Sequence, residues 1–243
     1  MQDKSNKDYW TEKQNLEWYK RQFKSPYRIT VAFEKFLRQN VSISNDKVLD
    51  VGCGAGSALA YIADKYKNAQ FTGIDINTEL FQLFEGETNN IKLEKADCFN
   101  LDEKYKNQFD GVISLQTLSW LPEYKRPLEE ICKLNPRWIA VSSLFYNGKI
   151  NYTISIENYE RPTHEADFSK VNYNIYSVPI IQQLLQEYGY SNFCYQPFEI
   201  DMDITKPDHN DLGYYTIKTQ DNRRLAFNTC LFQPEGFFFA SKN

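Results

Sequence analysis

The sequence lacks several features that would assign it to a membrane or nucleic-acid-binding class. No stretch approaches the roughly 18 consecutive apolar residues of a transmembrane helix. The first seven residues, MQDKSNK, lack the apolar core of a signal peptide. Lysine and arginine form no basic run and the formal net charge is -4, whereas binding to phosphates needs clustered cations. We therefore expect a cytoplasmic protein without membrane insertion and without nucleic acid as its main partner.

Histidine and paired cysteine are also scarce. The chain has only two histidines, and its five cysteines are scattered without a C-x-x-C pair. An odd number of dispersed cysteines favours reduced thiols, and we expect no metal site. Aromatic residues, by contrast, are abundant, with 17 Tyr, 17 Phe and 4 Trp. They indicate either a bulky core or an aromatic-lined pocket.

The first 143 residues alternate between short apolar runs and helical patterns. Residues 8–40 predict an N-terminal helical cover. Strands are expected at 47–51, 71–75, from 91 towards 96, 109–115 and 138–142, and helices at 58–66, 78–84 and 125–133. This alternation predicts an α/β fold, in which helices cover both faces of a parallel sheet.

After residue 143 the pattern changes. Residues 144–176 are polar with scattered tyrosines and predict a long loop, which is typical of a substrate lid. A helix at 177–188, an extended run at 193–204, a hairpin at 214–227 and a strand at 237–240 should complete the sheet. The sequence thus predicts a single domain, 1–243. Its parts are a cover (1–40), a core (41–143), a lid (144–176) and a C-terminal completion of the sheet with a hairpin (177–243).

The most informative segment is 48–56, VLDVGCGAG. The first strand ends in Asp50, and glycines at 52, 54 and 56 precede a helical pattern. Glycines at this spacing allow a sharp turn and bring the backbone against a ligand. A dinucleotide fingerprint, G-x-G-x-x-G, would need its third glycine where Ser57 stands. The register D-x-G-x-G-x-G instead resembles motif I of the class I S-adenosylmethionine (SAM)-dependent methyltransferases.

Three later segments agree with this resemblance, in the expected order. Asp75 ends the second strand, Asp97 follows the third, and Gln116 follows the fourth. The resemblance covers residues 47–145. It implies a three-layer Rossmann-like fold with a seven-stranded, mostly parallel sheet. It also implies SAM as the methyl donor, S-adenosylhomocysteine (SAH) as the product, and no metal.

The resemblance also implies which residues contact the donor. An acid at position 75 can accept hydrogen bonds from both ribose hydroxyls, Ile76 would lie against adenine, and Asp50 could stabilise the ligand's cation. The cofactor residues that it implies are Asp50, Gly52, Cys53, Gly54, Gly56, Asp75, Ile76, Asp97, Cys98, Phe99 and Gln116. In the N-terminal cover, Tyr19 could close over SAM and Arg28 could reach its carboxylate, with core packing and solvent exposure as the alternatives.

The range of possible acceptors is narrowed mainly by motifs that the sequence lacks. The fourth strand ends in LQT, without the N/D-P-P-Y/F signature of amino-methylating nucleic-acid enzymes. The acids that grip a polyamine in aminopropyl transferases are also missing there. Segments 171–176 and 214–232 resemble parts of bacterial methyltransferases that act on surface-polysaccharide sugars, which implies an oxygen of a sugar or sugar nucleotide. A small amine acceptor and a non-catalytic SAM-binding scaffold stay open, as do monomer and homodimer.

Catalysis here consists mainly of aligning the nucleophile and excluding water. An alcohol would also need its proton removed, and His164 in the predicted lid is the candidate base. Alternatively, His164 is an exposed histidine without a catalytic role, and this is the interpretation that we favour for His209. Predicted substrate contacts are Trp120, Tyr146, Tyr173, Asn174 and Tyr176. For the lid residues among them, the alternative is packing on the helix that follows.

Overall fold

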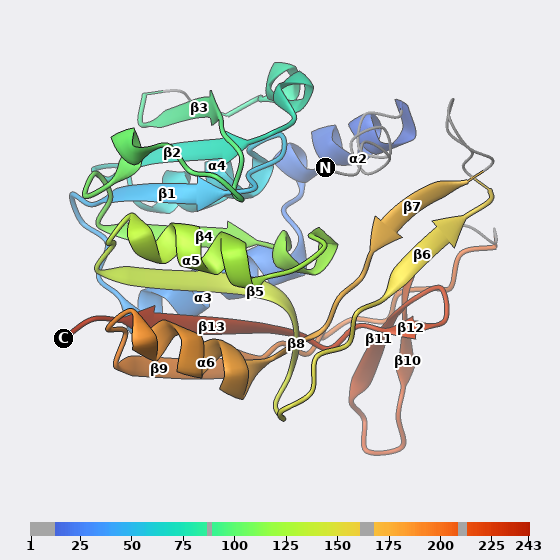
Figure 1. The fold of residues 1–243 in the computed structure, drawn as a ribbon. Coiled ribbons are helices and arrows are strands. Elements are labelled where there is room, and N and C mark those ends of the chain that lie inside the picture. The colour runs from blue at the N-terminus through green and yellow to red at the C-terminus, as the bar shows by residue number, and fades with distance from the viewer. Residues whose placement is uncertain (1–12, 87–88, 161–167, 209–212) are drawn as a thin grey trace.

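A computed structural model describes residues 13–86, 89–160, 168–208 and 213–243 (Figure 1). Its main sheet has the strand order β3-β2-β1-β4-β5-β13-β9, and the two-residue strand β8 also pairs with β5. These strands are β1 (Lys47–Val51), β2 (Gln70–Asp75), β3 (Ile91–Lys95), β4 (Gly111–Leu115), β5 (Trp138–Tyr146), β8 (Tyr176–Ser177), β9 (Asn192–Pro197) and β13 (Glu235–Ser241).

The direction of each strand decides which residues meet at the functional edge. β3, β2, β1, β4 and β5 are parallel, whereas β13 is antiparallel to both β5 and β9. The Rossmann-like, mostly parallel sheet is therefore confirmed. Because β13 runs in reverse, its first residue, Glu235, pairs with Leu144 near the end of β5. The start of β13 thus shares an edge with the carboxyl ends of the parallel strands.

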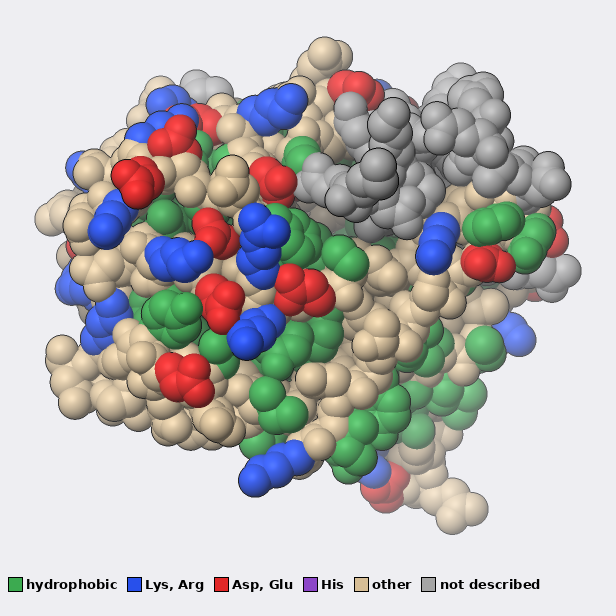
Figure 2. All heavy atoms as spheres, viewed as in Figure 1, with side chains coloured by type: hydrophobic (Ala, Val, Ile, Leu, Met, Phe, Trp, Pro, Cys, Tyr) green, Lys and Arg blue, Asp and Glu red, His purple; other side chains and the backbone are tan. Residues whose placement is uncertain are grey.

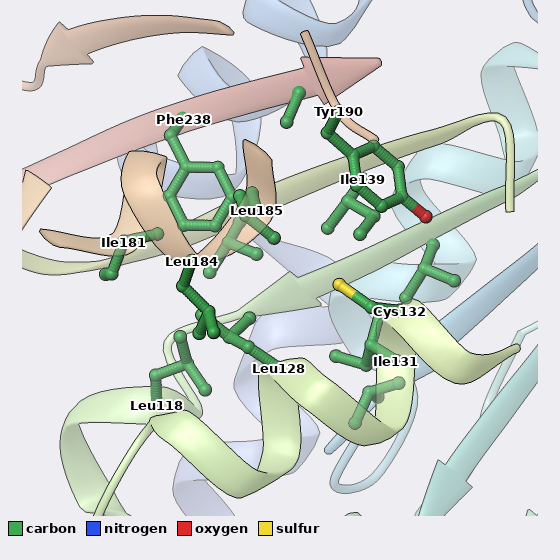
Figure 3. Packing of buried hydrophobic residues seen from close by; sticks show 14 of the residues in the cluster. Leu118, Leu128, Ile131, Cys132, Ile139, Ile181, Leu184, Leu185, Tyr190 and Phe238 are labelled. Carbon is green, nitrogen blue, oxygen red and sulfur yellow. The ribbon is translucent and has the colours of Figure 1, made fainter. Parts of the chain in front are cut away.

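Helices cover both faces of the sheet. They are α2 (Lys13–Lys24), α3 (Arg28–Asn40), α4 (Ser57–Lys65), α5 (Lys125–Lys133) and α6 (Val178–Glu187). On one face, α5 and α6 bury Leu128, Ile131 and Leu185 against the sheet (Figure 3). On the other face, α3 and α4 bury side chains such as Phe33 and Leu59. Each such side chain stabilises the fold by about 1.5–3 kcal/mol, and the result is a three-layer molecule.

Three predictions about secondary structure were wrong. Residues 78–84 were expected to form a helix, but only a 3-10 helix, η1 (Thr78–Leu83), is present. Residues 144–176 are not a simple loop, because β5 continues to Tyr146 and β6 (Ser155–Asn158) pairs antiparallel with β7 (Ser169–Asn172). The extended run ends at Pro197 rather than at 204. Strands of four residues carry too little alternation to be recognised among polar residues.

The predicted C-terminal hairpin is present and belongs to a separate three-stranded sheet. This sheet consists of β10 (Tyr214–Lys218), β11 (Arg224–Asn228) and β12 (Leu231–Phe232). It and the β6–β7 pair project beyond the carboxyl ends of the parallel strands, and α2 lies at the same end (Figure 1). Two further 3-10 helices are η2 (Glu103–Tyr105) and η3 (Leu118–Trp120). The additions to the core therefore surround one edge of the main sheet.

The visible surface differs between the core and these additions. On the face shown in Figure 2, Lys and Arg are interspersed with Asp and Glu over the core, and hydrophobic side chains gather toward the small sheets. Within the described ranges, no helix has both the length and the apolar character needed to cross a membrane.

Candidate active site

The glycine turn after β1 has the backbone geometry that its sequence predicts. Gly52 and Gly54 have φ angles of 79° and 55°, in the left-handed region that other residues rarely adopt. A Cβ atom on Gly52 would lie 2.4 Å from the Thr117 side chain, so no side chain fits there. The Gly54 amide donates a 2.8 Å hydrogen bond to Asp75 Oδ2. The turn is therefore tied to the end of β2.

Helix α2 closes over this turn. The Tyr19 ring comes within 3.3 Å of where a Cβ on Gly54 would stand. Ser57 Oγ donates a 3.0 Å hydrogen bond to Gln22 Oε1, and the Phe23 ring packs edge-on against Phe84 at 5.8 Å between centroids. Helix α2 thus forms one wall of the site.

A cavity of about 1610 Å³ lies at this end of the sheet. It exceeds the roughly 300–1,000 Å³ of an ordinary ligand pocket, so it can hold two ligands. Predicted residues from the turn and cover that line it are Tyr19, Arg28, Gly52, Cys53 and Gly54. Predicted residues from the next strand ends are Asp75, Ile76, Asp97, Cys98, Phe99 and Gln116. Trp120 and Tyr173 line the other end, so the structure brings these residues together around one space.

Five predicted residues lie elsewhere. Among the described residues, the cavity wall does not include Asp50, Gly56, Tyr146, Asn174 or Tyr176. Asp50 is buried behind the turn, with 2% of its surface exposed. Gly56 is the N-cap residue of α4.

For the three lid residues, the prediction of a cavity contact is corrected. The Asn174 side chain is fully buried and holds the lid together. It accepts a 2.8 Å hydrogen bond from the Ile154 amide and donates to Leu121 O and Tyr176 Oη. The bond from Asn174 also holds the Tyr176 hydroxyl. Tyr146 instead packs on Tyr152 at the surface.

Burial governs the ionisation of the carboxyl groups near the turn. It raises the pKa of Asp75, although backbone N–H groups of Asn77 and Gly54 partly oppose this shift. Burial, with a smaller contribution from Asp75, raises the pKa of Asp50 to about 8. Burial also raises the pKa of the Cys53 thiol well above its usual value, which agrees with a packing role for this cysteine. Asp97 Oδ1 accepts from the Phe99 amide at 2.9 Å.

Gln116 adopts a conformation that is unusual outside glycine. Its φ angle is 55°, which costs about 1–2 kcal/mol for a residue with a side chain. Its amide donates to Ser142 O at 2.8 Å, and its Nε2 donates to Ser142 Oγ at 2.7 Å. The neighbouring strand therefore holds this strained residue in the cavity wall, as is common at functional sites.

Two polar residues that the sequence analysis did not single out face the same half of the cavity. Asn77 is 4% exposed, and neither side-chain polar atom has a hydrogen-bond partner among the described residues. Gln22 Nε2 is likewise buried without one. Both residues line the cavity. Buried polar groups are normally satisfied, so these atoms indicate a polar ligand. In the sequence, only the position of Asn77, two residues after Asp75, could have indicated a role in the site.

At the other end of the cavity, the sequence analysis also missed Glu235 and Tyr214. The Tyr214 hydroxyl donates a 2.8 Å hydrogen bond to Glu235 Oε2, and burial raises the pKa of Glu235 to about 7. Nearby, Asn228 Nδ2 donates to the Tyr173 hydroxyl. Glu235 opens a strand that is remote in sequence, so no local pattern connected it with the glycine turn.

Comparison with known families agrees with this geometry. A family model described as a methyltransferase domain matches residues 42–168, which is just over half of the chain. The chain belongs to the class I SAM-dependent methyltransferase family. The matched range includes the glycine turn and the ends of β1, β2, β3 and β4.

Individual relatives of this methyltransferase are distant. (S)-tetrahydroprotoberberine N-methyltransferase from Eschscholzia californica is 27% identical over 120 residues, 46% of this chain and 32% of the relative. Fatty-acid O-methyltransferase from Mycolicibacterium smegmatis is 29% identical over 94 residues, 38% of this chain and 34% of the relative. The matched part thus spans about a third of the length of these two curated relatives.

A solved structure supports the fold over nearly the whole chain. It is phosphoethanolamine N-methyltransferase 2 of Haemonchus contortus, in complex with phosphomonomethylethanolamine and SAH. The TM-score is 0.58 at 10% sequence identity, and the match covers 98% of this chain and 60% of that one. At this identity the likeness concerns the fold alone.

In the half of the cavity beside the glycine turn, the residues are suited to binding SAM. Gly52, Cys53 and Gly54 line the cavity, so a ligand there would lie against the turn. Each Asp75 oxygen accepts one backbone N–H bond, which leaves a lone pair on each for a ribose hydroxyl. The unpartnered atoms of Gln22 and Asn77 would offer it further polar contacts. Within the described ranges, His, Cys, Asp and Glu form no cluster that could bind a metal ion.

The two histidines cannot be placed at this site. His164, the predicted base, and His209 lie outside the described residues.

Proposed function

We propose that this chain transfers the methyl group of SAM to a small molecule bound in the same cavity. The observation that carries the proposal is the continuity of the cavity, which runs from the glycine turn to an aromatic end at Trp120 and Tyr173. Because it is larger than a single ordinary ligand requires, donor and acceptor can occupy it together.

The chain's own residues position the reactants. SAM, when bound, supplies a methyl group on a positively charged sulfur, which is already activated for transfer. Asp75 accepts hydrogen bonds from the ribose, and Gln22 and Asn77 bind other polar groups of the donor. Helix α2 covers the turn through Tyr19 and limits the access of water. The chain thus aligns the donor with an acceptor at the aromatic end.

The chemistry of the acceptor forms a second part of the proposal. One relative is named as an N-methyltransferase and another as an O-methyltransferase, and these names support a small-molecule acceptor without preferring nitrogen or oxygen. The sugar or sugar-nucleotide oxygen stays a prediction from the sequence. The role of His164 as a base also stays a prediction from the sequence.

Calorimetry with SAH tests the donor site. Asp75→Ala should weaken SAH binding about 10- to 100-fold, because hydrogen bonds to a charged group contribute about 1.5–3 kcal/mol. The matched control is Asp64→Ala, since Asp64 lies on α4 with its side chain 54% exposed. The control should bind SAH as the unchanged protein does.

Two results would contradict this part of the proposal. If the unchanged protein binds neither SAM nor SAH at millimolar concentration, the donor assignment fails. If Asp75→Ala keeps full affinity, Asp75 does not contact the ribose.

A further inference from the structure

A half-buried carboxyl group lies in the cavity apart from the groups that we assign to the methyl donor. Glu235 opens β13 and pairs with Leu144 of β5, and both residues line the cavity. The antiparallel direction of β13 brings this carboxyl to the edge where the parallel strands end. The Tyr214 hydroxyl holds one of its oxygens at 2.8 Å.

Aromatic side chains line the same cavity as Glu235. The Trp120 and Tyr173 rings pack edge-to-face with centroids 4.2 Å apart. Both line the cavity, as does Tyr214. A cation is stabilised by aromatic faces and by a carboxylate, so this end of the cavity offers a cation two kinds of attraction.

Arg28, Arg126 and Lys170 line the same cavity, but no described lysine or arginine forms an ion pair with Glu235. Tyr214 is the one described titratable side chain that acts on the pKa of Glu235, and no lysine or arginine contributes. Burial dominates and raises that pKa to about 7. A buried carboxylate without a counterion is costly, and a pKa near neutrality suits a group that accepts a proton during reaction.

We propose that Glu235 binds the acceptor as a protonated primary or secondary amine and removes its proton, so that the methyl group is transferred to nitrogen. This inference rests on the function proposed above and names the class of its acceptor.

The step balances without a further reactant. One proton passes from the ammonium nitrogen to the Glu235 carboxylate, and the freed lone pair forms the new C–N bond. The methyl C–S bond breaks, its electron pair stays on sulfur, and SAH is released. The N-methylated product carries the positive charge, and Glu235 returns its proton to solvent.

The walls also favour an amine over a sugar. Phe198, Ile200 and Met202 line the cavity and suit an apolar body, whereas a sugar would place hydroxyls against them. A neutral hydroxyl would also leave the carboxylate without an opposite charge. We therefore expect an amine with an aromatic or aliphatic body.

The test compares Glu235→Gln with the unchanged protein, using labelled SAM. The acceptors are phenethylamine, N-methylphenethylamine and hexylamine, and the matched alcohols are 2-phenylethanol and hexanol, with glucose as a sugar. We expect methylated amines and a loss of at least about 100-fold in kcat/KM for Glu235→Gln. SAH affinity should stay within twofold. The control is Glu187→Gln, since Glu187 is exposed on α6.

Amine binding to the SAH-loaded protein is measured on the same panel by calorimetry. Glu235→Gln should weaken it at least tenfold and leave alcohol binding unchanged. Transfer to alcohols or glucose alone would overturn the inference, and so would amine turnover that survives Glu235→Gln but not His164→Ala. Where no acceptor is methylated, the absence of Glu235-dependent amine binding overturns it too. Loss of SAH binding by the unchanged protein would instead reject the function proposed above.

Discussion

At the scale of single residues, the site depends on polar groups that are buried without full satisfaction. Asn77, Gln22 Nε2 and Asp50 Oδ1 are buried without hydrogen-bond partners in the described part of the chain. Each such group lowers the stability of the unliganded protein by an amount on the order of 1–3 kcal/mol. A ligand that satisfies Asn77 and Gln22 recovers part of this free energy, which is the usual relation between stability and function at a binding site.

Asp50→Asn should therefore stabilise the unliganded protein in a pH-dependent way. The native pKa of Asp50 is raised to about 8 by burial, whereas an unfolded aspartate titrates near 3.9. The native state thus holds the proton more tightly, and the contribution of Asp50 to stability falls as the pH rises from about 4 to 8. Asparagine carries no such charge. The melting temperature of the variant should exceed that of the unchanged protein by an amount that grows across this range.

Thermal unfolding between pH 5 and 9 measures this difference, with Asp64→Asn as the exposed control. A difference that does not change with pH would show that Asp50 ionises normally in the native protein.

At the scale of elements, α2 is the part of the site whose stability depends most on its packing contacts. It has 12 residues, a length at which an isolated helix is marginal in water, so its stability depends on what it packs against. Its described contacts around the turn include Tyr19 on Gly54, Gln22 with Ser57 and Phe23 on Phe84. A ligand between α2 and the turn would add contacts to it.

SAH should accordingly slow amide hydrogen exchange in α2, by about tenfold or more at saturation. Mass spectrometry of peptides that cover residues 13–24 measures this change. Peptides from α6, which packs with α5 on the face of the sheet opposite α3 and α4, serve as the control and should gain less protection at short labelling times. Equal protection of both helices, or of neither, would contradict a role for α2 in covering the donor.

Some helices and strands could be predicted from the sequence and others could not. The alternating strands and helices of residues 47–142 were predicted because buried parallel strands are continuously apolar and their flanking helices are amphipathic. The β6–β7 pair was missed because its four-residue strands lie in a polar segment. The helix expected at 78–84 is a 3-10 helix, since a segment of this length is too short for propensity to decide.

At the scale of the whole molecule, ligand binding and stability are coupled through one cavity. Its walls come from both ends of the chain, from α2 to β13. A ligand that binds only the folded state therefore stabilises the entire domain by mass action.

SAH at one hundred times its dissociation constant should stabilise the protein by about 2.7 kcal/mol. For a domain of this size, this corresponds to a rise in melting temperature of roughly 5–10 °C. Differential scanning calorimetry measures the shift, with adenosine triphosphate as a nucleotide control. An equal shift with both ligands would indicate a nucleotide site without preference for SAH.

The sequence by itself determined which strand ends meet beside the glycine turn. Asp50, the glycine turn, Asp75, Asp97 and Gln116 lie at the ends of successive strands, and parallel strands bring such ends to one edge of the sheet. Local order along the chain was therefore enough to predict Gly52, Asp75 and Gln116 as neighbours. Only the tertiary structure decided the other half of the cavity. Glu235 reaches the cavity because β13 runs antiparallel beside β5, and Asn174 is withdrawn from it because its amide holds the lid. Such contacts join residues far apart in sequence, so packing and not local pattern determines them.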